Sequence, residues 1–158
     1  MVQMTNSEGT LEALHFACAL ACGKQAKVAL VKMVPVQHPA LLGTEFGDMN
    51  LTGQDREEMA NYQVIASNYG VAAEAHYFQY VTLAEAVAEA ADYVDAQIVF
   101  AALPNSLIPF WRRFHAWMLR RRLIQRNRQL YLLEHDRRST HWTPSILVPA
   151  AHHPGSFS

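Results

Sequence analysis

The sequence predicts an α/β fold: a doubly wound, mostly parallel five-stranded sheet, with room for an extra strand near the C-terminus. Two observations predict it. Apolar stretches of strand length alternate with stretches of helical periodicity along the chain. The apolar stretches are also nearly continuous, as in parallel strands that are covered on both faces. The chain has 158 residues, of which 51% are hydrophobic, enough for one compact core. We expect residues 1–150 to form a single domain and residues 151–158 a disordered tail.

The first half of the chain alternates strands and helices. Leu11, Leu14 and Cys18 recur at helical spacing, and Gly23 follows as a stop signal. Acidic residues such as Asp55 lie in the first turn of the helix expected over 55–69, where they complement the helix dipole. In order, we expect a strand over 1–5, a helix over 10–22, a strand over 27–36, a loop over 38–54, a helix over 55–69 and a strand over 71–80.

The second half continues the alternation and then becomes basic. Thr82 and Glu85 have the spacing of a capping box, which predicts the start of a helix. Alternating βα units of this length favour a parallel sheet with helices on both faces. In order, we expect a helix over 82–96, a strand over 97–103, a long basic helix over 107–127, a strand over 129–135, a turn-rich loop over 137–144 and a last strand over 145–150.

The charge distribution is polarised although the net charge is only −1. Residues 1–100 contain 4 Lys/Arg and 12 Asp/Glu, whereas residues 101–158 contain 9 Arg and 2 Asp/Glu. This pattern suggests an anionic partner or self-association with opposed charges. The sequence pI of about 6.7 and the lack of a reader motif argue against nucleic acid binding. We see no membrane span or secretion signal and expect a cytoplasmic protein.

The layout of residues 4–134 resembles the universal stress protein family, which has a doubly wound βα sheet like that of adenine nucleotide α hydrolases. Residues 5–21 resemble the first turn and helix of that family, and residues 28–39 resemble its second strand. Residues 73–103 resemble the third strand, the helix after it and the fourth strand. The resemblance implies a role in stress response, and a homodimer formed through the C-terminal strands.

The resemblance also exposes a departure at the nucleotide site. In ATP-binding members, a glycine-rich loop after the fourth strand wraps the phosphates, because glycine lets backbone amides approach closely. The matching residues 101–118 contain no glycine. The family's aspartate at the end of the first strand is also missing, with Asn6 as the nearest equivalent. Both departures favour the branch of the family that does not bind ATP, so no cofactor is expected.

Candidate binding residues follow for the alternative that a nucleotide or anion binds. Asn6 and Ser7 lie in the first strand-to-helix turn, and simple N-capping of the helix is the preferred interpretation. Val34 stands where the second strand's backbone meets adenine in binders. In this alternative arginines replace the glycine loop and hold ATP, AMP or another anion. The full candidate set is Asn6, Ser7, Val34, Arg112, Arg113 and Arg120.

The basic helix is the most unusual feature of the sequence. Trp111, Phe114 and Met118, with Leu107 one turn earlier, form an apolar stripe. The preferred interpretation is that these aromatic residues pack on the sheet, while the arginines are solvated or pair with the acidic half of a neighbour. A second interpretation is that the helix docks on a protein partner or an anionic membrane through Trp117, its neighbouring aromatics and the arginines.

No catalytic or metal site is expected. His15, Cys18 and Cys22 share a helix face, but their alanine-rich surroundings indicate a core rather than zinc ligands. None of the resembling segments is a catalytic signature, although weak ATP hydrolysis stays open. The sequence therefore predicts a non-enzymatic regulatory or signalling domain. The alternatives are a nucleotide- or anion-binding protein and a peripheral membrane or transporter-associated domain.

Overall fold

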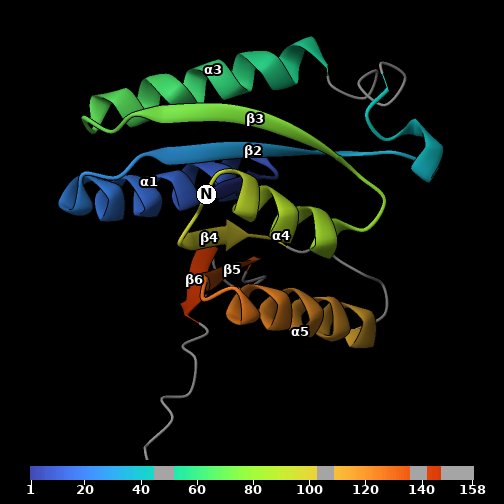
Figure 1. Cartoon of the computed structure of the whole chain (residues 1–158). Coiled ribbons are helices and arrows are strands. Elements are labelled where there is room, and N and C mark those ends of the chain that lie inside the picture. The colour runs from blue at the N-terminus through green and yellow to red at the C-terminus, as the bar shows by residue number, and fades with distance from the viewer. Residues whose placement is uncertain (45–51, 103–108, 136–141, 147–158) are drawn as a thin grey trace, which may run out of the picture.

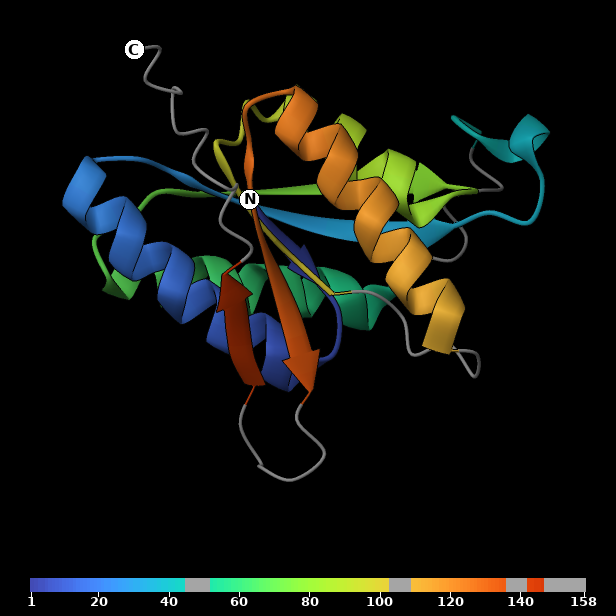
Figure 2. The ribbon, with the colours of Figure 1, turned by 90° about the horizontal axis from the view of Figure 1, so that it is seen from below.

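The computed structural model describes residues 1–44, 52–102, 109–135 and 142–146. These residues form one six-stranded sheet with helices on both faces (Figures 1 and 2). The elements in chain order are β1 (Val2–Met4), α1 (Ser7–Lys24), β2 (Val28–Pro35), the 3-10 turn η1 (Pro39–Leu41), α3 (Gly53–Asn68), β3 (Ala73–Tyr80), α4 (Leu83–Tyr93), β4 (Ile98–Ala101), α5 (Pro109–Gln125), β5 (Gln129–His135) and β6 (Trp142–Ile146).

The strand order is β3-β2-β1-β4-β5-β6, and every pairing except β5 with β6 is parallel. The chain winds outward from β1 first through β2 and β3, and then in the other direction through β4 and β5. The predicted doubly wound, mostly parallel sheet is therefore confirmed. The switch point between the two directions lies between β1 and β4, where open α/β sheets commonly bind ligands at the carboxyl ends of the strands.

The sixth strand forms a hairpin with β5 within the chain. It pairs antiparallel with β5, from Tyr131 opposite Ile146 to His135 opposite Trp142. The predicted position of the last strand was partly wrong, because β6 begins at Trp142, inside the segment that we expected to be a loop. Residues 147–150 of the predicted strand and the predicted tail, 151–158, lie outside the described residues.

The helices divide the core into two layers, one on each face of the sheet. Figure 2 shows α1 and α3 on one side, and α4 and α5 on the other. On the first side Leu14 and Cys18 of α1 pack with Val2 and Leu30 of the sheet. On the second side alanines and Val87 of α4 pack with Leu119 and Leu123 of α5. Both faces are thus covered, which explains the nearly continuous apolar strands.

The start of α4 at Thr82 was predicted correctly, but the capping box expected there was wrong. Thr82 lies at the N-cap of α4, but its side chain makes no capping hydrogen bond. Glu85 accepts instead from Arg122 of α5, with Nη2 and Oε1 2.7 Å apart. The reciprocal capping box is found at α3, where Thr52 and Asp55 each accept from the other's backbone N–H. The carboxylate of Glu85, which the local sequence predicted to cap α4, therefore forms an ion pair between α4 and α5.

The apolar stripe predicted for the basic helix was wrong at Phe114. Leu119 and Leu123 are fully buried against α4 and the sheet, with Met118 partly buried beside them. Phe114 is exposed, because the buried side of α5 is rotated away from it. Leu107 and the side chain of Trp111 lie outside the described part of the chain.

Candidate functional site

In the turn after β1, side-chain oxygens of the chain accept hydrogen bonds from its own backbone N–H groups. Asn6 lies at the N-cap of α1, and its Oδ1 accepts from the backbone N–H of Gly9 at 3.0 Å. The hydroxyl of Thr10 accepts from the backbone N–H of Thr5 at 2.9 Å. The capping role predicted for Asn6 is confirmed. Ser7 is exposed at the start of α1, and its carbonyl oxygen accepts from the hydroxyl of Tyr62 at 3.4 Å.

A buried glutamine bridges the two strands at the switch point. The Oε1 atom of Gln3 accepts from the backbone N–H of Ala102, 3.2 Å away and just beyond β4. Gln3 and Thr10 are the buried polar side chains of the described core. The sequence reasoning missed Gln3, although a single polar residue within an apolar strand was a readable signal. A protein amide thus links β1 and β4 close to the edge where a ligand is expected in this type of sheet.

The remaining candidate residues are spread over different parts of the fold. Val34 is buried in β2 and stands opposite Gln79 of β3. Arg113 is exposed and Arg120 is half-buried. Both lie on α5, which covers the face of the sheet opposite to α1 (Figure 2). The two arginines lie about 10 Å apart along the helix axis. The structure does not gather them into one cluster with Asn6 and Ser7. The side chain of Arg112 lies outside the described residues.

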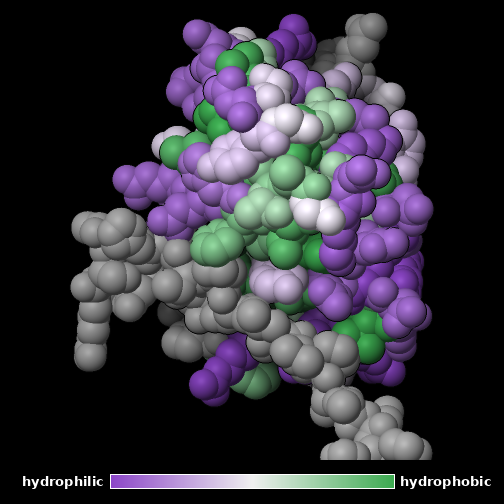
Figure 3. Space-filling model, turned by 90° about the vertical axis from the view of Figure 1, so that its left-hand side faces the viewer, coloured by the Kyte–Doolittle hydropathy of each residue, from purple (hydrophilic) through white to green (hydrophobic). Residues whose placement is uncertain are grey.

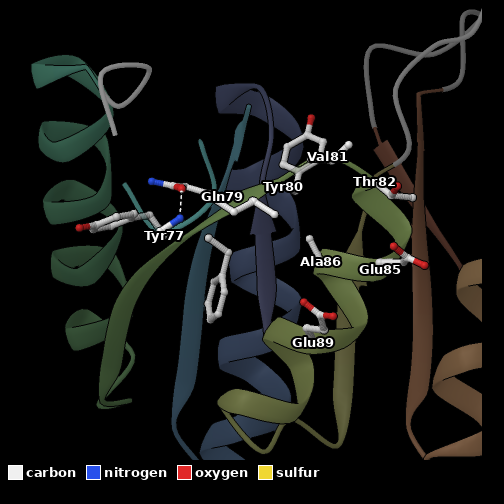
Figure 4. Close-up of a pocket in the computed structure, with 11 residues that line it drawn as sticks. Tyr77, Gln79, Tyr80, Val81, Thr82, Glu85, Ala86 and Glu89 are labelled. Carbon is white, nitrogen blue, oxygen red and sulfur yellow. Dashed lines mark hydrogen bonds between the residues drawn. The ribbon is translucent and has the colours of Figure 1, made fainter. Parts of the chain in front are cut away.

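A pocket of about 560 Å³ lies between the end of β3 and the start of α4 (Figure 4). Gln79 orders the loop beside it: Oε1 accepts from Gly43 at 2.7 Å, and Nε2 donates to the carbonyl of Thr44 at 3.0 Å. Burial raises the pKa of the Tyr80 phenol. The lining residues are Leu42, Gly43, Tyr77, Phe78, Gln79, Tyr80, Val81, Thr82, Glu85, Ala86 and Glu89.

The charge of this pocket is unfavourable for phosphate. Among the described residues, its lining contains two carboxylates, Glu85 and Glu89, and no lysine or arginine, and Glu85 is paired with Arg122 from outside the lining. Figure 4 shows both carboxylates on the α4 side of the pocket, with Tyr77 and Gln79 on the β3 side. Like charges repel, so Glu89 opposes a triphosphate here, whereas the ion pair with Arg122 offsets the charge of Glu85. The aromatic and acidic lining suits a neutral or cationic group better.

A second hollow, of about 620 Å³, lies at the amino ends of the strands. Leu20 of α1 and Ile98 of β4 belong to its lining, with Lys24 and Lys27 at the same end of the molecule. Figure 3 shows apolar surface in the middle of this face, surrounded by hydrophilic residues. Open α/β sheets bind ligands at the opposite, carboxyl edge. We therefore do not assign the nucleotide site to this hollow.

An ion pair connects β2 to the start of α3. Lys32 Nζ lies 2.5 Å from Asp55 Oδ1, and both side chains are largely buried. The hydrogen bond from Lys32 is the main cause that lowers the pKa of Asp55 from 3.8 to about 2, and bonds from Thr52 add to it, whereas burial opposes it. This lysine is therefore committed to a carboxylate.

The arginines of α5 and of the residues just after it divide into two groups by their interaction partners. Arg122 pairs with Glu85, and Arg126 and Arg128 both pair with Asp92 of α4. Part of the basic segment is thus neutralised by the acidic half of the same chain, and not only by a neighbour or solvent as we expected. Arg121 lies instead over the Trp117 ring, with its guanidinium carbon 5.5 Å from the centroid.

The histidine and cysteines of α1 do not form a ligand set. His15 Nδ1 lies 2.5 Å from the Tyr69 hydroxyl at the surface, whereas Cys18 is buried and Cys22 exposed. Within the described ranges, no group of three potential metal ligands is found. None of the helices in those ranges has the length and hydropathy of a membrane span.

Comparison with known proteins shows likeness at the level of structure. No family model matches the sequence, and no curated protein matches it closely enough to report. A universal stress family protein from Burkholderia pseudomallei aligns with a TM-score of 0.56 and 17% identity, over 84% of this chain and 93% of that one. A protein from Archaeoglobus fulgidus gives 0.56 and 17%, over 84% and 90%.

A third solved structure contains a nucleotide. It is a universal stress protein in complex with cAMP, and it aligns with a TM-score of 0.58 and 16% identity, over 85% of this chain and 94% of that one. At such identities the likeness concerns the fold. The resemblance expected from the sequence is confirmed at that level, and the chain has the fold of the universal stress proteins.

Proposed function

We propose that this chain is a non-enzymatic regulatory or signalling domain that does not hold ATP in the manner of the nucleotide-binding universal stress proteins. The observation that carries the proposal is the absence of glycine from residues 101–118, which run from the last residue of β4 into α5. A side chain at each of these positions opposes the close approach of backbone amides to a triphosphate.

The surroundings of the site support the same proposal. The side-chain oxygens of Asn6 and Gln3 accept hydrogen bonds from backbone N–H groups of the protein itself. The pocket at β3 and α4 offers Glu89 together with Glu85, which is paired with Arg122, and the described part of its lining lacks a cation. Lys32 is paired with Asp55. Each of these arrangements lowers the attraction for a polyphosphate.

Thermal denaturation of nucleotide-free protein tests the proposal. A ligand present at a hundred times its dissociation constant stabilises a protein by about 2.7 kcal/mol. For a domain of this size that corresponds to a rise of roughly 5–10 °C in the melting temperature. We expect no rise with millimolar ATP, while an ATP-binding universal stress protein shifts in the same assay. A shift of several degrees would overturn the proposal. Phosphate release above that of a heat-inactivated sample would contradict the non-enzymatic role.

A second candidate is binding of a smaller nucleotide or another anion, and the cAMP-bound relative favours testing it. In this candidate Arg113 and Arg120 supply the positive charge, with AMP or cAMP as the ligand. Melting curves with each nucleotide test it, using Arg113→Glu and Arg120→Glu as probes and Arg56→Glu of α3 as the matched control. A shift that both probes abolish and the control keeps supports the candidate, and the lack of any shift removes it.

We further propose that the domain works in the cytoplasm as a homodimer joined through its C-terminal strands. Within the chain β6 already pairs with one edge of β5. The dimer contact would therefore run along the outer edge of β6, since a strand edge with unpaired backbone groups is a natural partner for a second strand. Analytical ultracentrifugation tests this: we expect twice the chain mass at micromolar concentration, and a monomer there would refute the dimer.

A further inference from the structure

Helix α5 has two chemically different sides. Leu119 and Leu123 face the core and are fully buried. Phe110, Phe114, Trp117, Arg121 and Ile124 follow one another at intervals of four and three residues, so they form a single stripe along the helix. We call these five residues the outer stripe of α5. Its length is about 21 Å, from the rise of 1.5 Å per residue.

The apolar members of the outer stripe are exposed to an unusual degree. The exposed fractions are 73% for Phe110, 40% for Phe114, 54% for Trp117 and 42% for Ile124. Single exposed apolar residues are common on soluble proteins, but a contiguous row of large ones marks an interaction surface. Neither of the two pockets described above has a described lining residue from α5.

The charge of the outer stripe favours an anionic partner. The α5 sequence PFWRRFHAWMLRRRLIQ contains no acidic residue. Arg122 is turned toward Glu85 of α4, whereas Arg113 and Arg121 are exposed. Stacking of Arg121 on Trp117 keeps the guanidinium close to the apolar surface. A helix that combines aromatic rings and arginines in this way is suited to the interface of an anionic bilayer.

A second copy of the same helix is a poor partner. In a symmetric α5–α5 contact, each Arg113 and Arg121 would meet arginines of the other copy, and no carboxylate of either helix would compensate them. A membrane also needs no preformed groove, because exposed aromatic side chains insert among lipid headgroups.

We propose that the outer stripe of α5 docks this domain onto anionic lipid membranes, with Phe110 and Trp117 inserted and Arg113 and Arg121 at the headgroups. This goes beyond the proposed regulatory function and does not depend on whether a nucleotide binds. Each arginine near a surface of phosphatidylserine contributes about fivefold to the partition coefficient. Replacing both with glutamate reverses two charges and therefore lowers binding at least 25-fold by the same estimate, ~5 × 5.

Vesicle co-sedimentation tests the proposal with the full chain. We expect pelleting with vesicles that contain phosphatidylserine at low salt, and little pelleting with pure phosphatidylcholine. The charge variant Arg113→Glu/Arg121→Glu and the apolar variant Phe110→Ser/Trp117→Ser should both stay in the supernatant. Matched controls are Arg56→Glu and Val64→Ser, two exposed positions on α3 at the opposite face. Both controls should pellet like the wild type.

Fluorescence gives a second readout that is independent of folding losses. Brominated lipids quench a tryptophan that enters the bilayer, so we expect strong quenching that Trp117→Phe reduces while pelleting continues. No pelleting of the wild type at low salt overturns the proposal. Equal pelleting with neutral vesicles, or stripe variants that bind like the wild type, also overturns it. If the stripe binds an acidic amphipathic peptide but no vesicle, its partner is a protein and the membrane proposal is wrong.

Discussion

Replacing Asp55 with asparagine should destabilise the protein in a pH-dependent way. Asp55 accepts from Lys32 and from the backbone N–H of Thr52, and its pKa falls from 3.8 to about 2. One pKa unit corresponds to about 1.4 kcal/mol, so the lowering of this pKa from 3.8 to about 2 is equivalent to roughly 2 kcal/mol. Asparagine keeps an acceptor for the cap and loses the charge. We expect a loss of about 1–2 kcal/mol in the free energy of unfolding at pH 7.

The sign of the pH effect follows from the lowered pKa. A carboxylate whose pKa is lower in the folded state stabilises that state above its unfolded pKa, and the contribution is lost as the pH falls through the folded value. The stability gap between wild type and Asp55→Asn should therefore be full at pH 5 and narrow toward pH 2.

Urea denaturation at a series of pH values measures this gap. Glu57→Gln removes an exposed carboxylate from the same helical turn and is the matched control, with an expected change within about 0.5 kcal/mol. Lys32→Met, alone and combined with Asp55→Asn, completes a double-mutant cycle. A gap that is the same at pH 5 and pH 3, or a coupling energy near zero, would refute the assigned role of the pair.

Three other predictions concern the fold. Thr52→Ala should cost about 1 kcal/mol in urea denaturation because it removes a capping box, whereas Thr82→Ala should cost less than about 0.5 kcal/mol because its side chain caps nothing; equal losses would contradict this. Leu119→Ala should cost about 2–5 kcal/mol in the same assay, since the side chain is fully buried, and a loss under 1 kcal/mol would show that α5 is wrongly packed. Iodoacetamide should modify Cys22 in the native protein and Cys18 only after unfolding, because Cys18 is buried and burial raises its pKa; mass spectrometry that finds both modified at the same rate would refute this.

The order and type of the elements could be read from the sequence because the apolar pattern follows from burial on both faces. The strand 129–135 was predicted with the bounds that the structure has. The start of α1 was predicted three residues late, at 10 instead of Ser7, since the polar first turn carries no apolar period. Local pattern therefore determined most of the sheet, and the least regular ends were missed.

Long-range pairing limited what could be predicted of the site. Glu85 fits a capping box by its local sequence, but Arg122, 37 residues away, takes its carboxylate. The stripe through Phe114 fits helical spacing as well as the stripe through Leu119 does, and only packing against α4 decides between them. Gln3 could be noticed as a polar residue in an apolar strand, but its partner Ala102 is 99 residues away and could not be read locally. We predicted one stripe from the helical spacing and missed that Leu119 and Leu123 face the core.

The central claim is that the glycine-free residues 101–118 do not wrap a triphosphate. The most direct test is a crystal structure. Crystals are grown without nucleotide and then soaked in ATP with magnesium. We predict electron density with no triphosphate held by backbone nitrogens of this segment. An ordered ATP whose phosphates accept hydrogen bonds from those nitrogens would contradict the account.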